Sequence, residues 1–438
     1  MTADLVTAAL SLAEDLAMEA GNPDAPRWIG ADVVGDERDA RIVDGPIGGG
    51  LYDGSAGVAL ALAAASRAGA AGLVPHVARS AAVDALTTGD FLASTANLDL
   101  ASGSAGIAYA AAWAGALLRD EEVADGARAL ALATAHRLPD ARLGPDLLIG
   151  RAGAVLGVLA VAGDDPEVAA ISRAVMRDVA AEGRDESWGR SWSRPDGEEG
   201  PGLLGLGHGA SGIAVALAEV TARGTPERDG IGAAIEGALA YERSWFDPDR
   251  PNWPDLRSAA PTSDGVDPGW STAWCHGAVG IGIARLRVAE VQSSAMRPAL
   301  LAEAGAAVQA ARHLVVAARG ALRAGTVHDC SLCHGLAGVV ELLLAAARVT
   351  GVGEHLQAAR RVARLMLDER RAAGYWPSGL SGIASRRQEP APEPEPPGLF
   401  LGRAGVLLTL LRAADPATAP SCALPEVMTG GRAALRDR

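Results

Sequence analysis

The sequence predicts an all-α protein whose helix pairs close into a ring, an α/α toroid of one domain spanning residues 1–438. Aromatic residues make up only 4% of the chain, while glycine (54 residues) and alanine are abundant. This composition suits helices that pack closely on small side chains better than a β-sandwich, which favours β-branched and aromatic residues. In addition, a Gly-x-x-Gly motif followed by an apolar helical run occurs at seven places. Such internal repetition predicts a series of similar helical units.

Each repeat is long enough to hold two helices. The second glycines of the motifs stand at positions 57, 106, 153, 212, 280, 338 and 405. The run after a motif, such as Val58–Ala63, is small and apolar and predicts an inner helix, whereas the amphipathic stretch Ala302–Ala318 predicts an outer one. Small inner helices favour a closed ring over an open solenoid. Because each motif begins an inner helix, we expect all seven loops at one end of the ring, which becomes the predicted site.

Three connections between motifs are long and rich in proline, glycine or acidic residues, at 184–202, 245–269 and 386–398. We interpret them as solvated insertions in one domain, and a lid or peptide-binding role is the alternative. The Pro/Glu-rich segment 386–398 is predicted to be a mobile loop. The longest uncharged run, Leu100–Leu118, is mostly Ala, Gly and Ser and predicts a buried helix rather than a membrane span.

Charge and residue content exclude several functional classes. A formal charge of −14 argues against a general basic surface for nucleic acid or anionic membranes. Lysine is absent, which excludes a P-loop, a pyridoxal Schiff base and the ATP-positioning lysine of protein kinases. The chain begins with acidic Asp4 where a signal peptide needs basic residues, so we expect a cytoplasmic protein. Four cysteines in such a chain indicate a metal site or catalysis before disulfides.

Two of the motifs read Cys-His-Gly-x-x-Gly, at Cys275-His276 and at Cys333-His334. They belong to consecutive repeats, so Cys275, Cys333 and His334 should be neighbours in space. Two thiolates and an imidazole suit Zn²⁺, and three protein ligands leave a fourth position for water or substrate, as in catalytic zinc sites. The alternative is a pair of buried cysteines with histidines that cap helices.

Other patterns in these motifs are weaker. Cys330 together with Cys333 and His334 matches the spacing of c-type haem attachment, which requires export and an axial partner. Cys330 as a fourth zinc ligand would make the site structural, but the motif of Cys275 has no equivalent cysteine. The run 207–212 matches a dinucleotide-binding fingerprint, yet no strand is predicted before it and the same motif recurs around the ring.

The chain resembles the LanC-like lanthionine cyclases, most closely the C-terminal cyclase domain of class II lanthipeptide synthetases, in segments 51–57, 207–212, 274–277 and 332–335. The resemblance implies a toroid of seven inner and seven outer helices, with zinc held by Cys275, Cys333 and His334. It also implies that a cysteine of a dehydrated precursor peptide adds to dehydroalanine or dehydrobutyrine to form a thioether ring. No dehydratase half is present and no lysine serves ATP, so we expect a separate dehydratase as a partner.

This reaction creates an enolate that must be protonated, which calls for a general acid near the metal. His208 lies one repeat before Cys275, in the equivalent position to His276, and is the candidate for this acid. The resemblance further implies an aspartate one repeat earlier. Asp146 fits that pattern and Asp99 has nearly the same spacing, while either could instead cap a helix.

Trp274 and His276 flank the first zinc ligand and are expected to line the pocket. His276 as a substitute ligand remains open at this stage. Two other functions remain open as well. One is the addition of glutathione to dehydroamino acids in proteins, and the other is a non-catalytic zinc toroid that presents peptides to partner enzymes.

Overall fold

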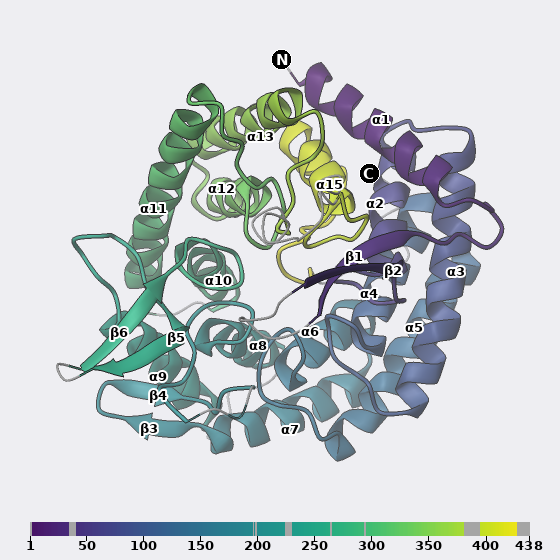
Figure 1. Ribbon diagram of the computed structural model, residues 1–438. Coiled ribbons are helices and arrows are strands. Elements are labelled where there is room, and N and C mark those ends of the chain that lie inside the picture. The colour runs from purple at the N-terminus through teal and green to yellow at the C-terminus, as the bar shows by residue number, and fades with distance from the viewer. Residues whose placement is uncertain are drawn as a thin grey trace.

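The computed structural model of the chain describes residues 2–34, 41–195, 197, 199–223, 230–262, 265–292, 295–380 and 395–426. Within these ranges, fourteen α-helices form two layers around a common axis, so the predicted α/α toroid is confirmed (Figure 1). The inner layer consists of α2 (Ser55–Arg67), α4 (Ser104–Leu118), α6 (Arg151–Ala162), α8 (Ala210–Ala222), α10 (Ala278–Val291), α12 (Leu336–Thr350) and α15 (Arg403–Ala414). The outer layer consists of α1 (Ala3–Glu19), α3 (Leu73–Ser94), α5 (Glu121–Arg137), α7 (Pro166–Glu182), α9 (Ile231–Ser244), α11 (Arg297–Arg323) and α13 (Gly353–Ala373).

The ring closes because the first outer helix meets the last inner one. Helix α1 packs against α15, and α15 packs against α2. The other inner helices each contact the outer helix that follows them and the inner helices on either side. At the closure, the Arg403 guanidinium at the start of α15 donates to the Glu19 carboxylate at the end of α1 (2.7 Å).

The inner helices are buried on nearly all sides, as their small apolar residues predict. In α4, every residue from Ser104 to Ala112 is buried, which confirms the buried-helix interpretation of this uncharged run. The outer helices instead bury one face, which in α13 includes Val362, Ala363 and Met366. Among the residues that the structure describes, no helix is both long and apolar enough to cross a membrane.

The second glycine of each motif permits an approach too close for any side chain. A Cβ atom at Gly153 would lie 1.7 Å from the carbonyl oxygen of Leu147, and the equivalent contact recurs in all seven motifs at 1.7 to 2.6 Å. On its other side, a Cβ at Gly280 would lie 2.8 Å from the Cβ of Leu206 in the preceding repeat. The motif therefore lets each inner helix start in direct contact with its own loop and with its neighbour.

The seven motif loops are joined by a closed circle of backbone hydrogen bonds, which we call the loop belt. The amide of Tyr52 donates to the carbonyl of Ala101 (2.9 Å), and each loop likewise donates to the next. The donors in order are Tyr52, Ala101, Leu148, Gly207, Trp274, Cys333 and Phe400, and Phe400 donates back to Tyr52 (2.8 Å). The fifth loop is shifted by one residue, because Trp274 rather than Cys275 donates to Cys333 (2.9 Å).

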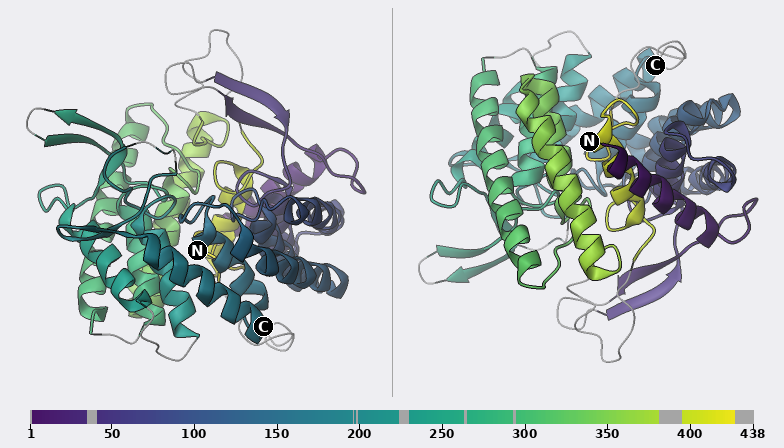
Figure 2. Two further views of the ribbon diagram at one scale, coloured as in Figure 1. Left: turned by 90° about the horizontal axis from the view of Figure 1, so that it is seen from below. Right: turned by 90° about the horizontal axis from the view of Figure 1, so that it is seen from above.

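Within the described residues, three antiparallel β-hairpins accompany the helices, and two of them lie in insertions for which the sequence analysis expected loops. They are β1 (Ile29–Val34) with β2 (Arg41–Pro46), β3 (Arg184–Glu186) with β4 (Gly189–Ser191), and β5 (Pro254–Thr262) with β6 (Gly265–Trp270). Both strands of a hairpin are edge strands, which tolerate proline, so the proline content of these insertions did not exclude strands. Hairpins β1–β2 and β5–β6 project from the same side of the ring (Figure 2).

The far end of the ring is closed by residues 419–426, which we call the C-terminal segment. The hydroxyl of Tyr109 on α4 donates to the carbonyl of Ser421 (3.2 Å), and the hydroxyl of Ser421 donates to Glu341 on α12 (2.8 Å). The chain therefore returns between the inner helices after α15.

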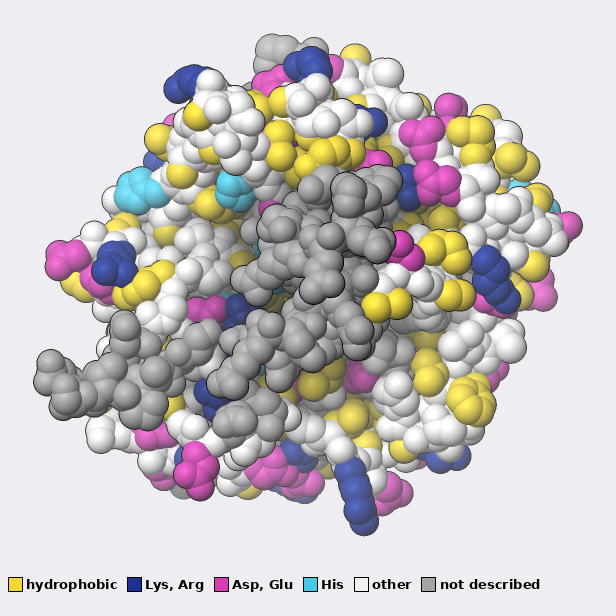
Figure 3. Space-filling view, viewed as in Figure 1, with side chains coloured by type: hydrophobic (Ala, Val, Ile, Leu, Met, Phe, Trp, Pro, Cys, Tyr) yellow, Lys and Arg dark blue, Asp and Glu magenta, His cyan; other side chains and the backbone are white. Residues whose placement is uncertain are grey.

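The Pro/Glu-rich insertion predicted at 386–398 lies mostly outside the described residues, which resume at 395. Its mobility stays a prediction. On the face seen in Figure 3, basic and acidic side chains of the described residues are interspersed around the rim with apolar ones. Basic side chains do not gather there into one field.

Candidate metal and catalytic site

The three motif histidines stand on consecutive inner helices. His208, His276 and His334 directly precede the glycines that begin α8, α10 and α12. Because the motif loops share the loop belt, their side chains meet at one end of the ring. His334 is exposed, His208 is intermediate and His276 is buried. The three positions are equivalent in sequence but not in environment.

Cys275, Cys333 and His334 come together, as their repeat positions predict. The two Sγ atoms and one imidazole nitrogen lie within 4.8 Å of one another. Two sulfurs held tetrahedrally by one zinc ion at about 2.3 Å are about 3.8 Å apart, so the cluster fits the ion with little movement. A donor set of two sulfurs and one nitrogen also matches the preference of zinc. Cys330 is not part of the cluster, and its Sγ lies 3.7 Å from the carbonyl oxygen of His328.

The two thiols of the cluster are electrostatically unequal. A hydrogen bond with Cys333 lowers the pKa of Cys275 well below its ordinary value, and His334 contributes in the same direction against the effect of burial. Burial raises the pKa of Cys333 well above its ordinary value, and Cys275 raises it further. Burial lowers the pKa of His334, but its hydrogen bond and charge interaction with Cys275 outweigh this and raise it overall. Cys275 is thus the more acidic of the two thiols.

His208 and Asp146 form a second pair at the same end of the ring. His208 Nδ1 lies 3.4 Å from Asp146 Oδ1, and the side chains are 25% and 2% exposed, respectively. The backbone amide of Ile149 donates to the same Oδ1 (2.9 Å), which fixes the carboxylate. Asp146 Oδ2 and His208 Nδ1 are both buried without a hydrogen-bond partner among the described residues. Buried polar atoms are rarely left unpaired without a functional or structural reason.

Asp99, the alternative aspartate, has a different setting. Its Oδ1 accepts hydrogen bonds from the amides of Ser102 (2.7 Å) and Gly103 (3.0 Å) in its own loop. It thus satisfies the amides that precede α4, in the manner of a capping residue. The structure places Asp146, and not Asp99, beside His208.

His276 is buried next to the cluster but is not one of its three ligand groups. Its Nδ1 lies 3.2 Å from the carbonyl oxygen of Leu204, so Nδ1 carries the hydrogen and Nε2 is the free nitrogen. Burial lowers the pKa of His276, although Cys275 and Asp255 act in the opposite direction. Its ring lies 6.1 Å from that of His208 between centroids.

Trp274 lies beneath the loops in a layer of aromatic rings. It is 1% exposed, and its indole nitrogen donates to the carbonyl of Ala423 in the C-terminal segment (2.9 Å). Its ring packs on Phe400 (4.7 Å between centroids), which stacks on Tyr52 (4.6 Å). This aromatic floor (Tyr52, Trp274 and Phe400) separates the metal cluster from the far end of the ring.

The sequence analysis missed Tyr52 as a site residue. Burial raises the pKa of its phenol well above the ordinary value, and the charge and hydrogen bond of Cys333 add to this effect. Tyr52 therefore contacts the cluster. A signal existed, because Tyr52 occupies in the first motif the position that Cys275 and Cys333 occupy in theirs.

The loop that carries His208 is held from behind by Glu242 of α9. Glu242 is fully buried, and its Oε1 accepts hydrogen bonds from the amides of Gly205 (2.9 Å) and Ser211 (3.0 Å). Its Oε2 accepts from Arg285 of α10 (2.9 Å), which is also fully buried. Helix α10 directly follows the loop that carries Cys275. The ion pair therefore links the loop of His208 to the loop of Cys275.

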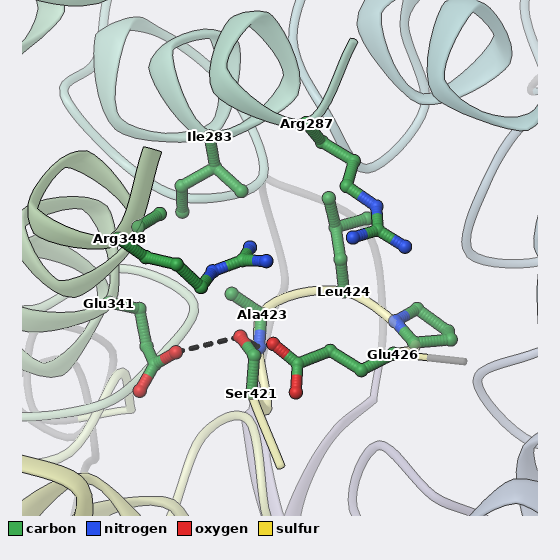
Figure 4. Close-up of a pocket in the computed structure, with 10 residues that line it drawn as sticks. Ile283, Arg287, Glu341, Arg348, Ser421, Ala423, Leu424 and Glu426 are labelled. Atoms are coloured by element: carbon green, nitrogen blue, oxygen red, sulfur yellow. Dashed lines mark hydrogen bonds between the residues drawn. The ribbon is translucent and has the colours of Figure 1, made fainter. Parts of the chain in front are cut away.

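A small pocket at the other end of the ring is unrelated to this cluster. It lies where the C-terminal segment meets α10 and α12, and Figure 4 shows Ser421 bonded to Glu341 at its wall. Arg287, Arg348 and Glu426 line it as well, and none of the predicted site residues does.

Comparison with known proteins identifies the family of this chain. Residues 45–425 match the family described as lanthionine synthetase C-like protein. Among solved structures, nisin cyclase is similar with a TM-score of 0.55 and 16% sequence identity, covering 83% of this chain and 88% of that one. An unsaturated glucuronyl hydrolase from Bacillus sp. GL1 has a TM-score of only 0.39 at 15% identity, over 72% of this chain and 85% of the other. The family match spans most of the sequence, and the chain belongs to the lanthionine synthetase C-like family.

Proposed function

We propose that this protein is a zinc-dependent lanthionine cyclase acting on a precursor peptide that a separate enzyme has dehydrated. The observation that carries the proposal is the meeting, at one end of the ring, of a donor set of two sulfurs and one nitrogen with the His208–Asp146 pair. The family supports the same reaction class. The absence of lysine supports a separate dehydratase, because the chain has no lysine to position ATP.

Cys275, Cys333 and His334 would hold the zinc ion. When bound, the ion supplies a Lewis acid that lowers the pKa of a substrate thiol from about 8.5 and furnishes a thiolate near neutral pH. Three protein ligands leave a fourth position for that thiol. The aromatic floor below the cluster excludes water from one side, which strengthens the electrostatic interactions above it.

In the reaction, the substrate sulfur forms a bond to Cβ of the dehydrated residue, and the π electrons move onto its carbonyl oxygen as an enolate. His208 then donates a proton to Cα, which restores the carbonyl group. Asp146 orients His208. Because the His208 side chain is 25% exposed, it can regain a proton from solvent. His276 is buried and its pKa is lowered, so it is less suited to this role.

The proposal is tested by incubating the zinc-loaded protein with a dehydrated precursor that contains cysteine. The expected product has the mass of the substrate and fewer free thiols, counted by alkylation. Tandem mass spectrometry should show that the peptide no longer fragments between the linked residues. An unchanged thiol count with zinc bound would overturn the proposal.

The same experiment separates the two alternative functions. Adding glutathione to the reaction tests the intermolecular reaction, which would increase the peptide mass by one glutathione per dehydrated residue. A non-catalytic scaffold would bind the peptide without either change. In that case His208→Asn would leave peptide binding and pathway output intact, whereas this substitution should stop a cyclase.

A further inference from the structure

The hairpin β5–β6 is fixed onto the loop that carries Cys275. Directly before β5, the side-chain amide of Asn252 donates to the carbonyl of Ser271 (3.1 Å) and to the hydroxyl of Thr272 (3.2 Å). Its carbonyl oxygen accepts from the amide of Ala278, the first residue of α10 (3.0 Å). The start of β5 is therefore bonded to residues on both sides of Cys275, and the strand extends from the loop that carries this cysteine.

Asp255 and Arg257 form a rigid pair on this strand. They are two residues apart, and their side chains contact each other directly. Arg257 Nε lies 3.0 Å from Asp255 Oδ1 and Nη2 lies 2.6 Å from Oδ2, a two-point contact that fixes the plane of the guanidinium. The Asp255 side chain is only 10% exposed, whereas that of Arg257 is 46% exposed. The carboxylate is thus an anchor, and Nη1 of the guanidinium donates no hydrogen bond to any residue that the structure describes.

The charge of Arg257 acts on the metal cluster. Burial lowers the pKa of Arg257, but the hydrogen bonds and charge of Asp255 raise it overall, with further contributions from Cys275 and Cys333. Arg257 also helps to lower the pKa of His276, for which burial is the main cause. The guanidinium therefore lies within electrostatic reach of both thiol ligands and of the histidine beside them.

A positive charge beside the metal cluster can stabilise negative charge that develops during the reaction. A divalent ion and two thiolates already balance in charge. A substrate thiolate adds one negative charge, and the addition moves that charge onto the carbonyl oxygen of the dehydrated residue. A fixed donor with a positive charge beside the cluster is suited to stabilise it, because preorganised donors are most effective where charge develops.

We propose that Arg257 is a further catalytic residue, which donates a charge-assisted hydrogen bond from its guanidinium to the enolate oxygen, with Asp255 as its positioning residue. The inference rests on the proposed cyclase function and deepens it. As sulfur bonds to Cβ, the π electrons reach the oxygen that Arg257 contacts, and the proton from His208 then enters at Cα. Arg257 keeps its own protons throughout.

The test compares three variants at saturating dehydrated peptide. Arg257→Gln is expected to lower kcat by about 10²-fold, as for the loss of one donor to an oxyanion. Arg257→Lys keeps the charge and should recover part of this loss. Arg250→Gln is the matched control, because Arg250 lies on the same insertion but stacks on Trp270 (4.4 Å to the ring centroid), and its kcat should stay within about twofold.

Two further measurements distinguish stabilisation of the enolate from binding or folding. Zinc content, and the Kd of a dehydrated peptide whose cysteines are replaced by serine, should both be unchanged in Arg257→Gln. Added guanidinium ion should restore part of the activity of Arg257→Ala, with no effect on the wild-type protein.

The outcomes separate this inference from the proposed function. If the wild-type protein forms no thioether, the cyclase proposal fails and this inference fails with it. If the wild-type protein is active and Arg257→Gln has an unchanged kcat, only the role of Arg257 is wrong. The role of Arg257 would also be wrong if Arg257→Gln lost zinc, or if it raised KM without lowering kcat.

Discussion

Both ends of the ring contain buried polar side chains, and the Asp146–His208 pair at the motif end differs in its hydrogen bonding from Glu341 at the far end. At the motif end, Asp146 Oδ2 and His208 Nδ1 have no hydrogen-bond partner among the described residues, and three ligand groups converge on one point. At the far end, Glu341 receives hydrogen bonds on both carboxylate oxygens, from Arg412 and Ser421 (2.8 Å each). In the proposed function the groups at the motif end serve the reaction, whereas Glu341 at the far end holds the C-terminal segment.

The difference teaches how to recognise the site without a bound ligand. A buried carboxylate whose oxygens are all paired stabilises a local structure, and removing one partner costs free energy of unfolding. Buried groups that stay unpaired, although neighbours could have bonded them, are available to a metal or a substrate. Three pairs of substitutions and one single substitution test this contrast.

The largest loss of activity is expected when a thiol of the metal cluster is removed. Cys333→Ala removes a ligand of the proposed zinc site, so metal binding should be lost and activity should fall by more than about 10³-fold. Cys422→Ala removes a thiol that is equally buried but lies in the C-terminal segment. It should keep both zinc and activity, as measured by metal analysis and the thiol assay. Zinc retained in Cys333→Ala would contradict the ligand assignment.

The second effect concerns proton transfer. His208→Asn should lower kcat by about 10² to 10⁴-fold while zinc content stays at the wild-type level, because a general acid is lost and no ligand is. His276→Asn is the matched control within the same end, and it should affect kcat less. If His276→Asn lost zinc or more activity than His208→Asn, the roles of the two histidines would have to be exchanged.

The third effect compares two buried ion pairs. Glu242→Gln and Glu341→Gln should each lower the free energy of unfolding by about 3 kcal/mol, since each removes a buried carboxylate from a buried arginine. Only Glu242→Gln should also lower kcat, by about tenfold, because Glu242 holds the loop of His208. Urea unfolding and single-turnover rates measure the two quantities. Equal kcat values in the two variants would make Glu242 purely structural.

The smallest effect is expected for a substitution at the far end of the ring, which should change stability but not activity. Ser421→Ala removes one hydrogen bond to Glu341 and should lower the free energy of unfolding by about 1 kcal/mol. Because the aromatic floor separates Ser421 from the metal cluster, kcat should not change. A change in kcat would show that the two ends are coupled through Trp274.

Much of the fold was predictable because its information is local. Each Gly-x-x-Gly motif marks a close backbone contact at the start of one helix, and the seven motifs predicted all seven inner helices. The hairpins were not predicted, since their strands are short or contain proline and have no periodic pattern that distinguishes them from loops. Strand β5 in particular owes its place to Asn252, whose hydrogen bonds reach residues far along the chain.

The site was predictable to the extent that it repeats. Equivalent positions in consecutive motifs brought Cys275, Cys333 and His334 together. The same reasoning applied to the first motif would have found Tyr52. Arg257 and Glu242 belong to no motif, and they reach the site only through tertiary contacts that the sequence pattern does not encode.

The loop belt is a closed ring of backbone hydrogen bonds, which is completed where Phe400 donates to Tyr52. No loop in it can swing outward alone, because each is held by the loop before and the loop after. Amide protons in the belt should therefore exchange with solvent only when the whole ring opens. The described residues of hairpins β1–β2 and β5–β6 contribute no hydrogen bond to the loop belt, so its closure depends on the motif loops alone.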